Sequence, residues 1–594
     1  MPPAIDLVGR ILVADPKTIS ETNTPAPPAP GTGWTRRVLF PLFAIVVGLL
    51  PCLLLEAGLR LFAVGRPADN ADLLSGFNRG APLFEQRGDV YHTTLARTGF
   101  FSTQEFSVAK PRNGFRIFCF GGSTVYGHPY QAATAFPKWL ELELNATDPA
   151  HDYQAINCGG ISYASYRLAL LVKEVLKYQP DLIILATGHN EFLEDRTFQS
   201  VKQRPALWAW VQDHAYELRT FTLLHRWMRG STAAANGRIA NDGVAPLSPE
   251  VRARLDNASG YASYHRDYAW HDNVIAQFDE SVREIINDCR AAGVPILLVK
   301  LGSNLRDCPP FKSEHRAGLT PPEEREWQKE FDVATSLMTT NAGQALEHYL
   351  KAAAIDDEYA LLNYRIARMA DRLGQLPDAL TYYGRARDED VCPLRIIKPL
   401  EQALTRIAVR TGTPLLDAGR LLSADSFDYI PGFESYLDHV HPTIGGHQKI
   451  ARALAAQMRE CRFVPTPANW PEDQRRQTWT RYLQQLGENY FAEGKERVNW
   501  LENWARRQRL VEEARPDDAL GYVRLGFRQL DLAEVQSAWQ SLDEAIDRDA
   551  TTIALMQKRA QELIVQGRPD YARSLRQHIS AVGEGQTRST GGAN

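Results

Sequence analysis

Two short segments of the sequence contain the residue types that nucleophilic catalysis needs. Ser123 follows two glycines in the segment FCFGGST, and His441 lies three residues after Asp438 in the segment YLDHVHPT. A serine hydroxyl becomes a good nucleophile only when a neighbouring base takes its proton, and a third group must orient that base. In one tight turn, the carboxylate of Asp438 can reach Nδ1–H of His441 and leave Nε2 free to face the serine. Ser123, His441 and Asp438 are therefore a candidate triad.

Two other kinds of site could use the same segments. Glycines after a first strand can cradle a phosphate, but the chain has neither G-x-x-x-x-G-K-[ST] nor G-x-G-x-x-G. His439 and His447 flank His441 and suggest a metal site, but no third ligand follows at a suitable spacing. We therefore expect no metal and no cofactor.

The alternation of apolar and helical segments predicts the strands and helices that position these residues. Between Phe115 and Gly188, short apolar runs alternate with helical stretches, which predicts parallel strands wound with helices. Two later apolar runs, 294–301 and 413–419, each follow an amphipathic helix. The sequence thus predicts an α/β fold, a three-layer α/β/α sandwich with a five-stranded parallel sheet. Ser123 comes directly after the first strand, at the sheet edge where open α/β folds place their sites.

Four segments together resemble the sequence blocks of the SGNH (GDSL-like) hydrolases. They are GGST, INCGGIS, GHNEF and DHVHPT, and they occur in the family's order over roughly residues 110–460, apart from insertions. The resemblance implies the flavodoxin-like SGNH fold, with Ser123 as nucleophile and Asp438 and His441 completing the triad. It also implies an oxyanion hole made by the Ser123 N–H, an N–H of the second block and the side-chain amide of Asn190.

The chain departs from the family pattern in three blocks. Gly122 stands where the first block usually has aspartate, and Glu191 replaces the aspartate of G-x-N-D. In the second block the family's donor glycine aligns best with Ser162, whereas Gly160 comes two residues earlier. Either Gly160 or Ser162 can therefore supply the backbone N–H. In isolation, Asn190 would be read as an asparagine that caps a turn at a strand end.

Two long insertions interrupt the hydrolase domain that we expect over residues 111–463. The first, 196–270, contains a helical stretch with tryptophans. This stretch either contributes ordinary hydrophobic packing or forms a lid or membrane-facing flap. The second, 336–390, contains two segments that match at an offset of 34 residues, the tetratricopeptide period. The region 464–594 repeats this offset between Ala538 and Ala572 and also resembles tetratricopeptide repeats. It either contacts a protein partner or only caps the hydrolase domain.

An uncharged apolar run near the N-terminus predicts a membrane anchor. Val38 to Leu55 is eighteen residues long without a charge, and Arg36 and Arg37 precede it. This predicts a cytoplasmic tail over 1–35, a single transmembrane helix within 36–63, and a linker or N-terminal extension over 64–110. The rest of the chain would then be periplasmic, anchored in the inner membrane. A cleavable signal peptide is the alternative, but the preceding tail is long and proline-rich, and no clear A-x-A site follows.

Charge and cysteine content limit the remaining classes of function. The net charge of −4 and the pI near 6.4 give no basic excess for binding nucleic acid. The seven cysteines include no C-x-x-C pair, so a zinc ribbon or a redox dithiol is not expected. Cys308 and Cys392 bracket the second insertion, and we predict a disulfide between them in an oxidising compartment. The alternative is that both are buried free thiols.

The resemblance implies a function for the whole chain. An extracytoplasmic, membrane-tethered serine esterase would remove acyl groups, O-acetyl above all, from a cell-envelope or exported polysaccharide. An O-acyltransferase could use the same triad with a sugar hydroxyl in place of water. A third alternative is a non-catalytic scaffold whose repeats recruit partners.

Overall fold

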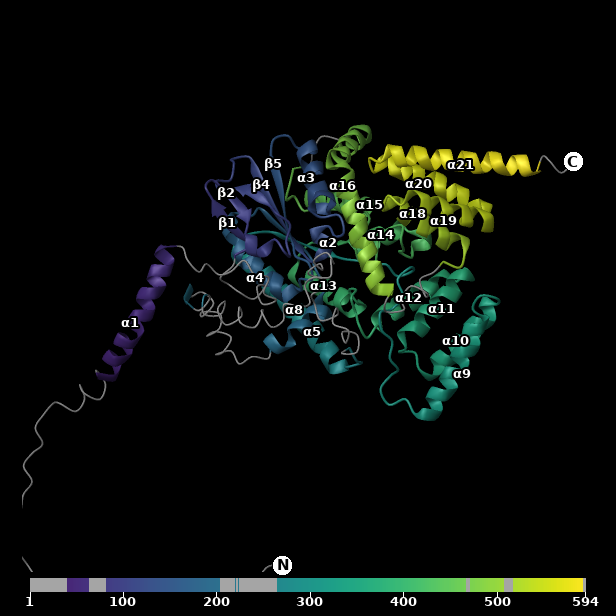
Figure 1. The fold of residues 1–594 in the computed structure, drawn as a ribbon, viewed down its shortest axis with the longest axis horizontal. Helices are drawn as coiled ribbons and strands as arrows, with labels where there is room; N and C mark the ends of the chain where they lie inside the picture. The colour runs from purple at the N-terminus through teal and green to yellow at the C-terminus, as the bar shows by residue number, and fades with distance from the viewer. Residues whose placement is uncertain are drawn as a thin grey trace, which may run out of the picture. The chain divides into compact units, whose positions relative to one another are not determined.

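A computed structural model describes residues 40–62, 82–202, 219–220, 223, 264–465, 471–506 and 516–590. The chain forms two compact units, residues 1–66 with 218–229 and residues 67–217 with 230–594. The larger unit contains the α/β core and the later helices (Figure 1).

The predicted five-stranded parallel sheet is confirmed, with the strand order β5-β4-β6-β7-β8. Its central strands β4, β6 and β7 form from apolar runs that are mostly buried on both faces, as is typical of parallel sheets, whereas the edge strand β8 is half-buried. In β6, LIILA, every residue is buried. The bounds are β4 Gly114–Gly121, β5 Asp152–Gly159, β6 Leu182–Ala186, β7 Ile296–Lys300 and β8 Leu415–Asp417.

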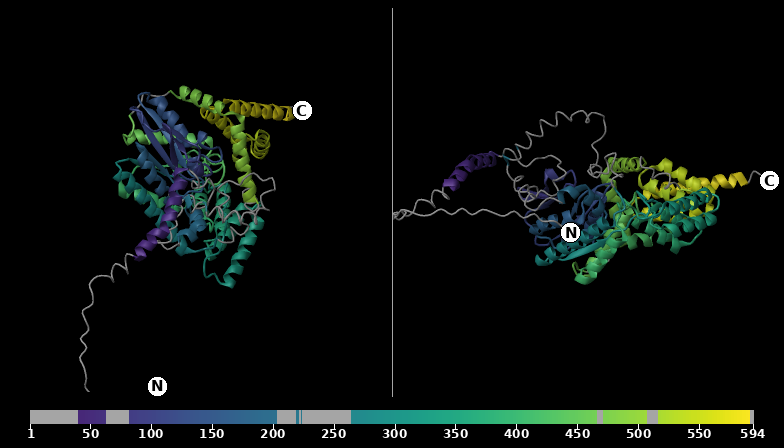
Figure 2. Two further views of the ribbon diagram at one scale, coloured as in Figure 1. Left: turned by 60° about the vertical axis from the view of Figure 1, so that its left-hand side comes forward. Right: turned by 90° about the horizontal axis from the view of Figure 1, so that it is seen from below.

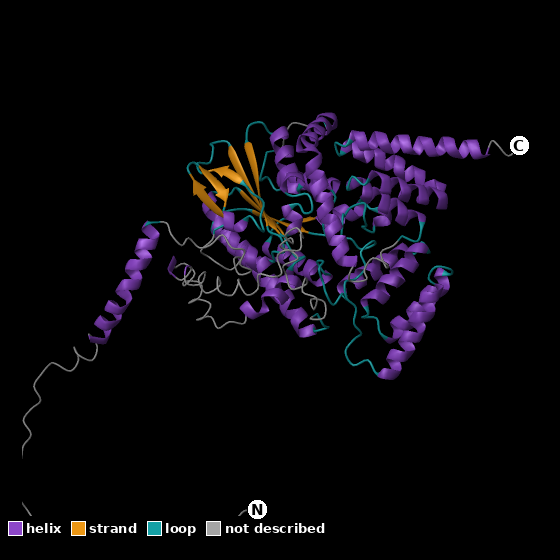
Figure 3. Ribbon diagram, in the orientation of Figure 1, coloured by secondary structure: helices purple, strands orange, loops and turns teal. Residues whose placement is uncertain are grey.

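Helices cover both faces of this sheet and make three layers (Figure 3). Successive residues of β4 face opposite sides: Phe118 and Phe120 join one apolar cluster, and Ile117 and Cys119 join the other. The first cluster includes side chains of α4 (Ser165–Val175), α8 (Tyr268–Ala291) and α13 (Lys398–Thr411). The second includes side chains of α3 (Phe136–Thr147), α14 (Ala418–Ala424) and α15 (Ile444–Glu460).

The region predicted as a linker or N-terminal extension, 64–110, contains a small antiparallel sheet. Its strands are β1 (Phe84–Arg87), β2 (Val90–Thr93) and β3 (Glu105–Ser107). Phe84 and Phe106 lie edge to face with Phe118 of the core sheet, at ring-centroid distances of 6.4 and 5.5 Å. The extension is therefore packed onto the α/β core.

The helical insertion consists of α9 (Pro321–Leu337), α10 (Ala342–Ile355), α11 (Ala360–Arg372) and α12 (Leu376–Asp388). Residues at the 34-residue offset can be equally buried: Tyr349 and Tyr383, which match at this offset, are both buried. Helix α9 starts well before residue 336, and its Trp327 packs in one apolar cluster with Tyr349 of α10. A capping box of Thr320 and Glu323 fixes that start.

The helices after residue 464 divide between two apolar clusters. In α16 (Glu472–Arg506), Trp479 packs on Trp139 of α3 with ring centroids 5.3 Å apart, so this helix belongs to the α/β core. A separate apolar cluster joins the last helices, which stack on one another in both views of Figure 2. They are α18 (Ala519–Asp531), α19 (Val535–Arg548), α20 (Ile553–Val565) and α21 (Pro569–Thr590).

Several hydrogen bonds attach these last helices to the core, two of which come from core side chains. The Tyr130 hydroxyl donates to the carbonyl of Asp531 at 2.7 Å, and Nε2 of Gln448 donates to the carbonyl of Gln566 at 3.1 Å. Short helical turns complete the described part of the chain. They are η2 (Leu95–Arg97), η3 (Ala132–Thr134), η4 (Leu176–Tyr178), η7 (Phe427–Tyr429) and η8 (Ala550–Thr552).

The smaller unit contains helix α1 (Phe40–Leu61), which covers most of the predicted membrane segment. Among the residues that the structure describes, no helix combines the length and the apolar character needed to cross a membrane. The predicted tail 1–35 and most of the insertion 196–270 lie outside the described residues; α5 (Glu191–Lys202) covers the beginning of that insertion. The anchor and its orientation stay predictions.

The predicted disulfide is wrong, because Cys308 and Cys392 are both free thiols. The thiol of Cys308 lies 3.5 Å from the carbonyl of Pro309, whereas Cys392 packs in a small apolar cluster. Hydrogen bonds close the base of the insertion instead. The Asp390 carboxylate accepts the N–H groups of Phe311 at 2.6 Å and Lys312 at 2.9 Å.

Candidate active site

Ser123 is the first residue of α2 (Ser123–Tyr126), the short helix that follows β4. The two glycines before it let neighbouring segments approach closely. A Cβ on Gly121 would lie 2.1 Å from the carbonyl oxygen of Ala186, and a Cβ on Gly122 would lie 2.4 Å from Nδ2 of Asn190. The N–H of Ser123 has no partner within its helix, because the first N–H groups of a helix have no carbonyl to reach.

His441 joins Ser123 to Asp438. Its Nε2 lies 2.7 Å from Oγ of Ser123, and its Nδ1 lies 2.6 Å from Oδ2 of Asp438. The second oxygen of Asp438 accepts the N–H groups of Val440 and His441, both at 2.9 Å. The structure thus brings together the three side chains that the sequence proposed as a triad.

The charge state of Asp438 decides which proton His441 carries. Burial acts to raise the pKa of this carboxyl, but His441, His439 and the hydrogen bonds from His441 hold it well below its usual value. The ionised carboxylate can only accept, so Nδ1 of His441 carries a proton. Nε2 is then the acceptor for the hydroxyl of Ser123, which is the state that a general base requires.

Asn190 lies in the loop after β6, four residues beyond Ala186, and beside Gly122. Its Nδ2 donates to the carbonyl of Tyr163 at 3.2 Å, which leaves the second hydrogen of the amide for another acceptor. The Asn190 carbonyl accepts the N–H of Glu194 at 2.9 Å, so the backbone of this residue is fixed as well.

The structure distinguishes the two candidate donors of the second block. The N–H of Gly160 donates to the carbonyl of Gly121 at 2.9 Å and is therefore occupied. Ser162 adopts a left-handed conformation with φ 61°, and its N–H has no acceptor among the described residues. A Cβ on Gly160 would lie 2.7 Å from ring atoms of Phe101 and Tyr163, so glycine is required there for packing. Ser162 is the better candidate donor.

Two buried glutamates hydrogen-bond the second sequence block to the third. They were not among the site residues predicted from the sequence. Glu191 accepts the N–H of Ser165 at 3.0 Å and its hydroxyl at 2.8 Å, and burial raises the pKa of Glu191 to about 7. Glu194 accepts the N–H of Ala164 at 2.8 Å and pairs with the buried Arg167. The sequence signals were Glu191 in the third block and the E-x-x-E spacing after Asn190.

Four further histidines surround His441, of which three are buried and His439 is half-buried, and desolvation lowers the pKa of each. The pKa falls to about 4 for His439 and about 3 for His447, and well below the usual value for His128 and His189. The ring of His128 lies 4.8 Å from that of His441. Nδ1 of His447 and of His189 accepts a backbone N–H, at 3.3 and 3.0 Å. Within the described ranges, no three His, Cys, Asp or Glu side chains gather as a metal site.

No family model matches this chain, and no curated protein matches it. The solved structures that are similar to it include a lipolytic protein and two mutants of an esterase. One is described as a lipolytic protein of the G-D-S-L family from Desulfitobacterium hafniense DCB-2; it is 9% identical, covers 58% of this chain and 98% of its own, and has a TM-score of 0.25.

The other two are mutants of Axe2. The first, a catalytic mutant of this acetylxylan esterase from Geobacillus stearothermophilus, is 12% identical over 59% of this chain and 96% of its own, with a TM-score of 0.26. The second, named an acetyl-xylooligosaccharide esterase, is 12% identical over 60% of this chain and 100% of its own, with a TM-score of 0.27. TM-scores this low carry no argument about activity, so the roles proposed below rest on the geometry of the site.

Proposed function

We propose that this chain is a serine ester hydrolase in which Ser123 is the nucleophile. The observation that carries the proposal is the continuous hydrogen-bonded series from Asp438 through His441 to Ser123, at 2.6 and 2.7 Å. Nucleophile, base and orienting carboxylate are within hydrogen-bond reach of one another, as acyl transfer by this mechanism requires.

The proposed reaction has two halves. Oγ of Ser123 attacks the acyl carbon while Nε2 of His441 takes its proton, and the imidazolium then gives that proton to the departing alcohol. The oxyanion accepts hydrogen bonds from the Ser123 N–H, the Ser162 N–H and the Asn190 amide. In the second half, His441 activates a water molecule that cleaves the acyl-serine and regenerates the hydroxyl.

The proposed substrate is an O-acetyl ester of a cell-envelope or exported polysaccharide. The proposal includes a single-pass inner-membrane anchor with the catalytic domain in the periplasm, supported by Arg36 and Arg37 before the uncharged run. It also includes tetratricopeptide-like repeats as a surface for a protein partner. The buried residue pairs at the 34-residue offset, such as Ala538 with Ala572, support the repeat assignment.

A second candidate function is an O-acyltransferase with the same triad. One observation favours it: Ser123 is only 4% exposed and His441 is 0% exposed. A site that excludes water favours a sugar hydroxyl over hydrolysis of the acyl-enzyme. If it is a transferase, adding an oligosaccharide acceptor should divert acetyl groups from acetate to the sugar.

The test of the nucleophile uses a fluorophosphonate probe and p-nitrophenyl acetate. The wild type should label and hydrolyse the ester, and Ser123→Ala should do neither while keeping its fold. Ser303→Ala is the control, because Ser303 is equally buried and its hydroxyl has no hydrogen-bond partner among the described residues. Unchanged hydrolysis by Ser123→Ala would refute the proposed function.

A further inference from the structure

The loop that carries Asp438 and His441 has its shape fixed by its own backbone. The N–H of Leu437 donates to the carbonyl of His441 at 2.8 Å, and the N–H of Thr443 donates to the carbonyl of Ser435 at 3.0 Å. These bonds close the turn that brings the carboxylate to the imidazole. They do not fix where the turn stands relative to Ser123.

The end of this loop after His441 is held by the α/β core. The hydroxyl of Thr443 caps α15 by accepting the N–H of Gly446 at 3.1 Å, and α15 packs against α3. The end before Asp438 packs in the core cluster through Tyr436 and Leu437, and it is also held by a helix that lies far away in the sequence.

That helix is α18, and the residue is Arg528. Its Nε donates to the carbonyl of Leu437 at 2.6 Å, and its guanidinium carbon lies 4.7 Å from the ring centroid of Phe433. Arg528 is only 3% exposed. The carbonyl of Leu437 belongs to the peptide unit that ends at the N–H of Asp438. Because a peptide unit is planar, fixing this oxygen also fixes the direction in which the chain enters Asp438.

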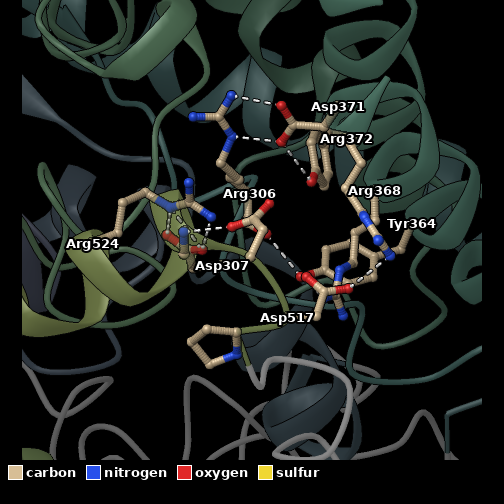
Figure 4. A pocket seen from close by; sticks show the side chains of 12 residues that line it. Arg306, Asp307, Tyr364, Arg368, Asp371, Arg372, Asp517 and Arg524 are labelled. Carbon is tan, nitrogen blue, oxygen red and sulfur yellow. Dashed lines mark hydrogen bonds and ion pairs between the residues drawn. The ribbon is translucent and has the colours of Figure 1, made fainter. Parts of the chain in front are cut away.

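A second arginine of α18 acts on the same loop through Asp307. Nη2 of Arg524 lies 3.0 Å from Oδ1 of Asp307, and Figure 4 shows the two side chains facing each other. Oδ2 of Asp307 accepts the N–H of Phe433 at 2.9 Å. Asp307 follows β7 in a segment whose Asn304 N–H donates to the carbonyl of His439 at 3.0 Å.

The spacing of the two arginines explains why one helix can make both contacts. Residues four apart lie one above the other on the same face of a helix, so Arg524 and Arg528 present two guanidinium groups to the loop. Both are buried. A buried guanidinium needs hydrogen-bond or ion-pair partners, and here Arg528 donates to the triad loop at Leu437 and Arg524 pairs with Asp307, which supports that loop.

We infer that Arg528 is a positioning residue of the triad, so that the C-terminal helices form part of the machinery that aligns Asp438 and His441. The inference rests on the proposed function. In this arrangement Arg528 touches neither substrate nor the reacting atoms. It acts through Leu437 on the orientation of Asp438, and through Asp438 on the base.

The test compares Arg528→Met with wild type in the full chain. Methionine keeps an unbranched apolar side chain against the ring of Phe433 and removes the donor to Leu437. Because a misplacement of about 1 Å in a triad costs about 10²-fold in rate, we expect kcat for p-nitrophenyl acetate to fall about 10- to 100-fold. KM should stay within about threefold, since no substrate contact is removed.

Two controls separate positioning from general loss of structure. Leu575→Ala removes a buried side chain of the same helical cluster without contacting the loop; it should lower thermal stability and leave kcat nearly unchanged. In an Asp438→Asn background, Arg528→Met should add less than about threefold, because both changes act on one element.

The outcomes are distinct. If Ser123→Ala abolishes activity but Arg528→Met loses no more than Leu575→Ala, the positioning role is refuted and the proposed function stands. The positioning role is also refuted if the losses in kcat caused by Arg528→Met and by Asp438→Asn multiply in the double variant, because the two residues then act independently. If Ser123→Ala keeps full activity, the proposed function fails and the positioning role fails with it.

Discussion

Replacing Gly122 by alanine adds one methyl group at the contact between the first and third sequence blocks. The new Cβ would lie 2.4 Å from Nδ2 of Asn190, whereas its next neighbours, Cγ of Asn190 and the carbonyl oxygen of Tyr163, would be at an ordinary 3.6 Å. Gly122 has an extended backbone with φ −84° and ψ −152°, so alanine does not have to adopt a left-handed conformation there. The substitution therefore acts on one atom group, the Asn190 amide.

The size of the effect follows from these distances. Non-bonded heavy atoms are at optimal separation at about 3.5 Å or more, so the amide must retreat by about 1 Å. Its hydrogen bond to Tyr163 would stretch, at a cost of about 1 kcal/mol in stability. A donor displaced by about 1 Å loses most of its stabilisation of the oxyanion, so kcat should fall about 10²-fold. The fall should not exceed about 10³-fold, the loss expected when the donor is removed altogether.

The assay measures kcat for p-nitrophenyl acetate together with the thermal unfolding midpoint of each variant. Gly384→Ala in α12 is the matched control, because a Cβ there meets nothing within 4 Å; it should leave kcat unchanged. In an Asn190→Ala background, Gly122→Ala should add little, since the displaced group is already absent. Activity within threefold of wild type, or losses that multiply in the double variant, would refute this account of Gly122.

Three further predictions follow. Asn190→Ala should lower kcat by about 10²- to 10³-fold, and a drop under threefold would remove this amide from the oxyanion hole. Burial raises the pKa of Glu191 from 4.5 to about 7, so the folded protein loses stability as pH rises through this range. Relative to Glu191→Gln, wild type should lose about 3 kcal/mol of unfolding free energy between about pH 4.5 and 7.5. A difference between the two proteins that does not change with pH would contradict this. A reporter active only in the cytoplasm, fused after residue 594, should be silent if the proposed topology holds, whereas strong activity would reverse the orientation.

Local sequence patterns were sufficient to predict the sheet and the proximity of the triad residues. The strands are runs of consecutive apolar residues, and Ser123 and Asn190 lie within four residues of the ends of two of them, so the parallel order brings both to one edge. The turn of Asp438 and His441 is short enough to be inferred from spacing alone. The types of these residues and their positions in the sequence were therefore enough to predict most of the arrangement of the site.

Other features depend on contacts between distant segments, which no local pattern reveals. The choice between Gly160 and Ser162 depends on a hydrogen bond from Gly160 to Gly121. The disulfide prediction relied on the two ends of the insertion lying close together, but the Asp390 carboxylate closes that base. The contact of Arg528 with Leu437 joins segments 91 positions apart.

Helix α16 has a consequence for synthesis of the chain on the ribosome. The five strands of the core sheet and α15 are complete by residue 460, whereas α16, whose Trp479 packs on Trp139, ends at Arg506. At 5–20 residues per second, the nascent α/β core carries Trp139 without this partner for roughly 2 to 9 s. During that interval the unfinished protein offers an apolar surface to chaperones and to neighbouring nascent chains, and translation speed between residues 460 and 506 sets how long it lasts.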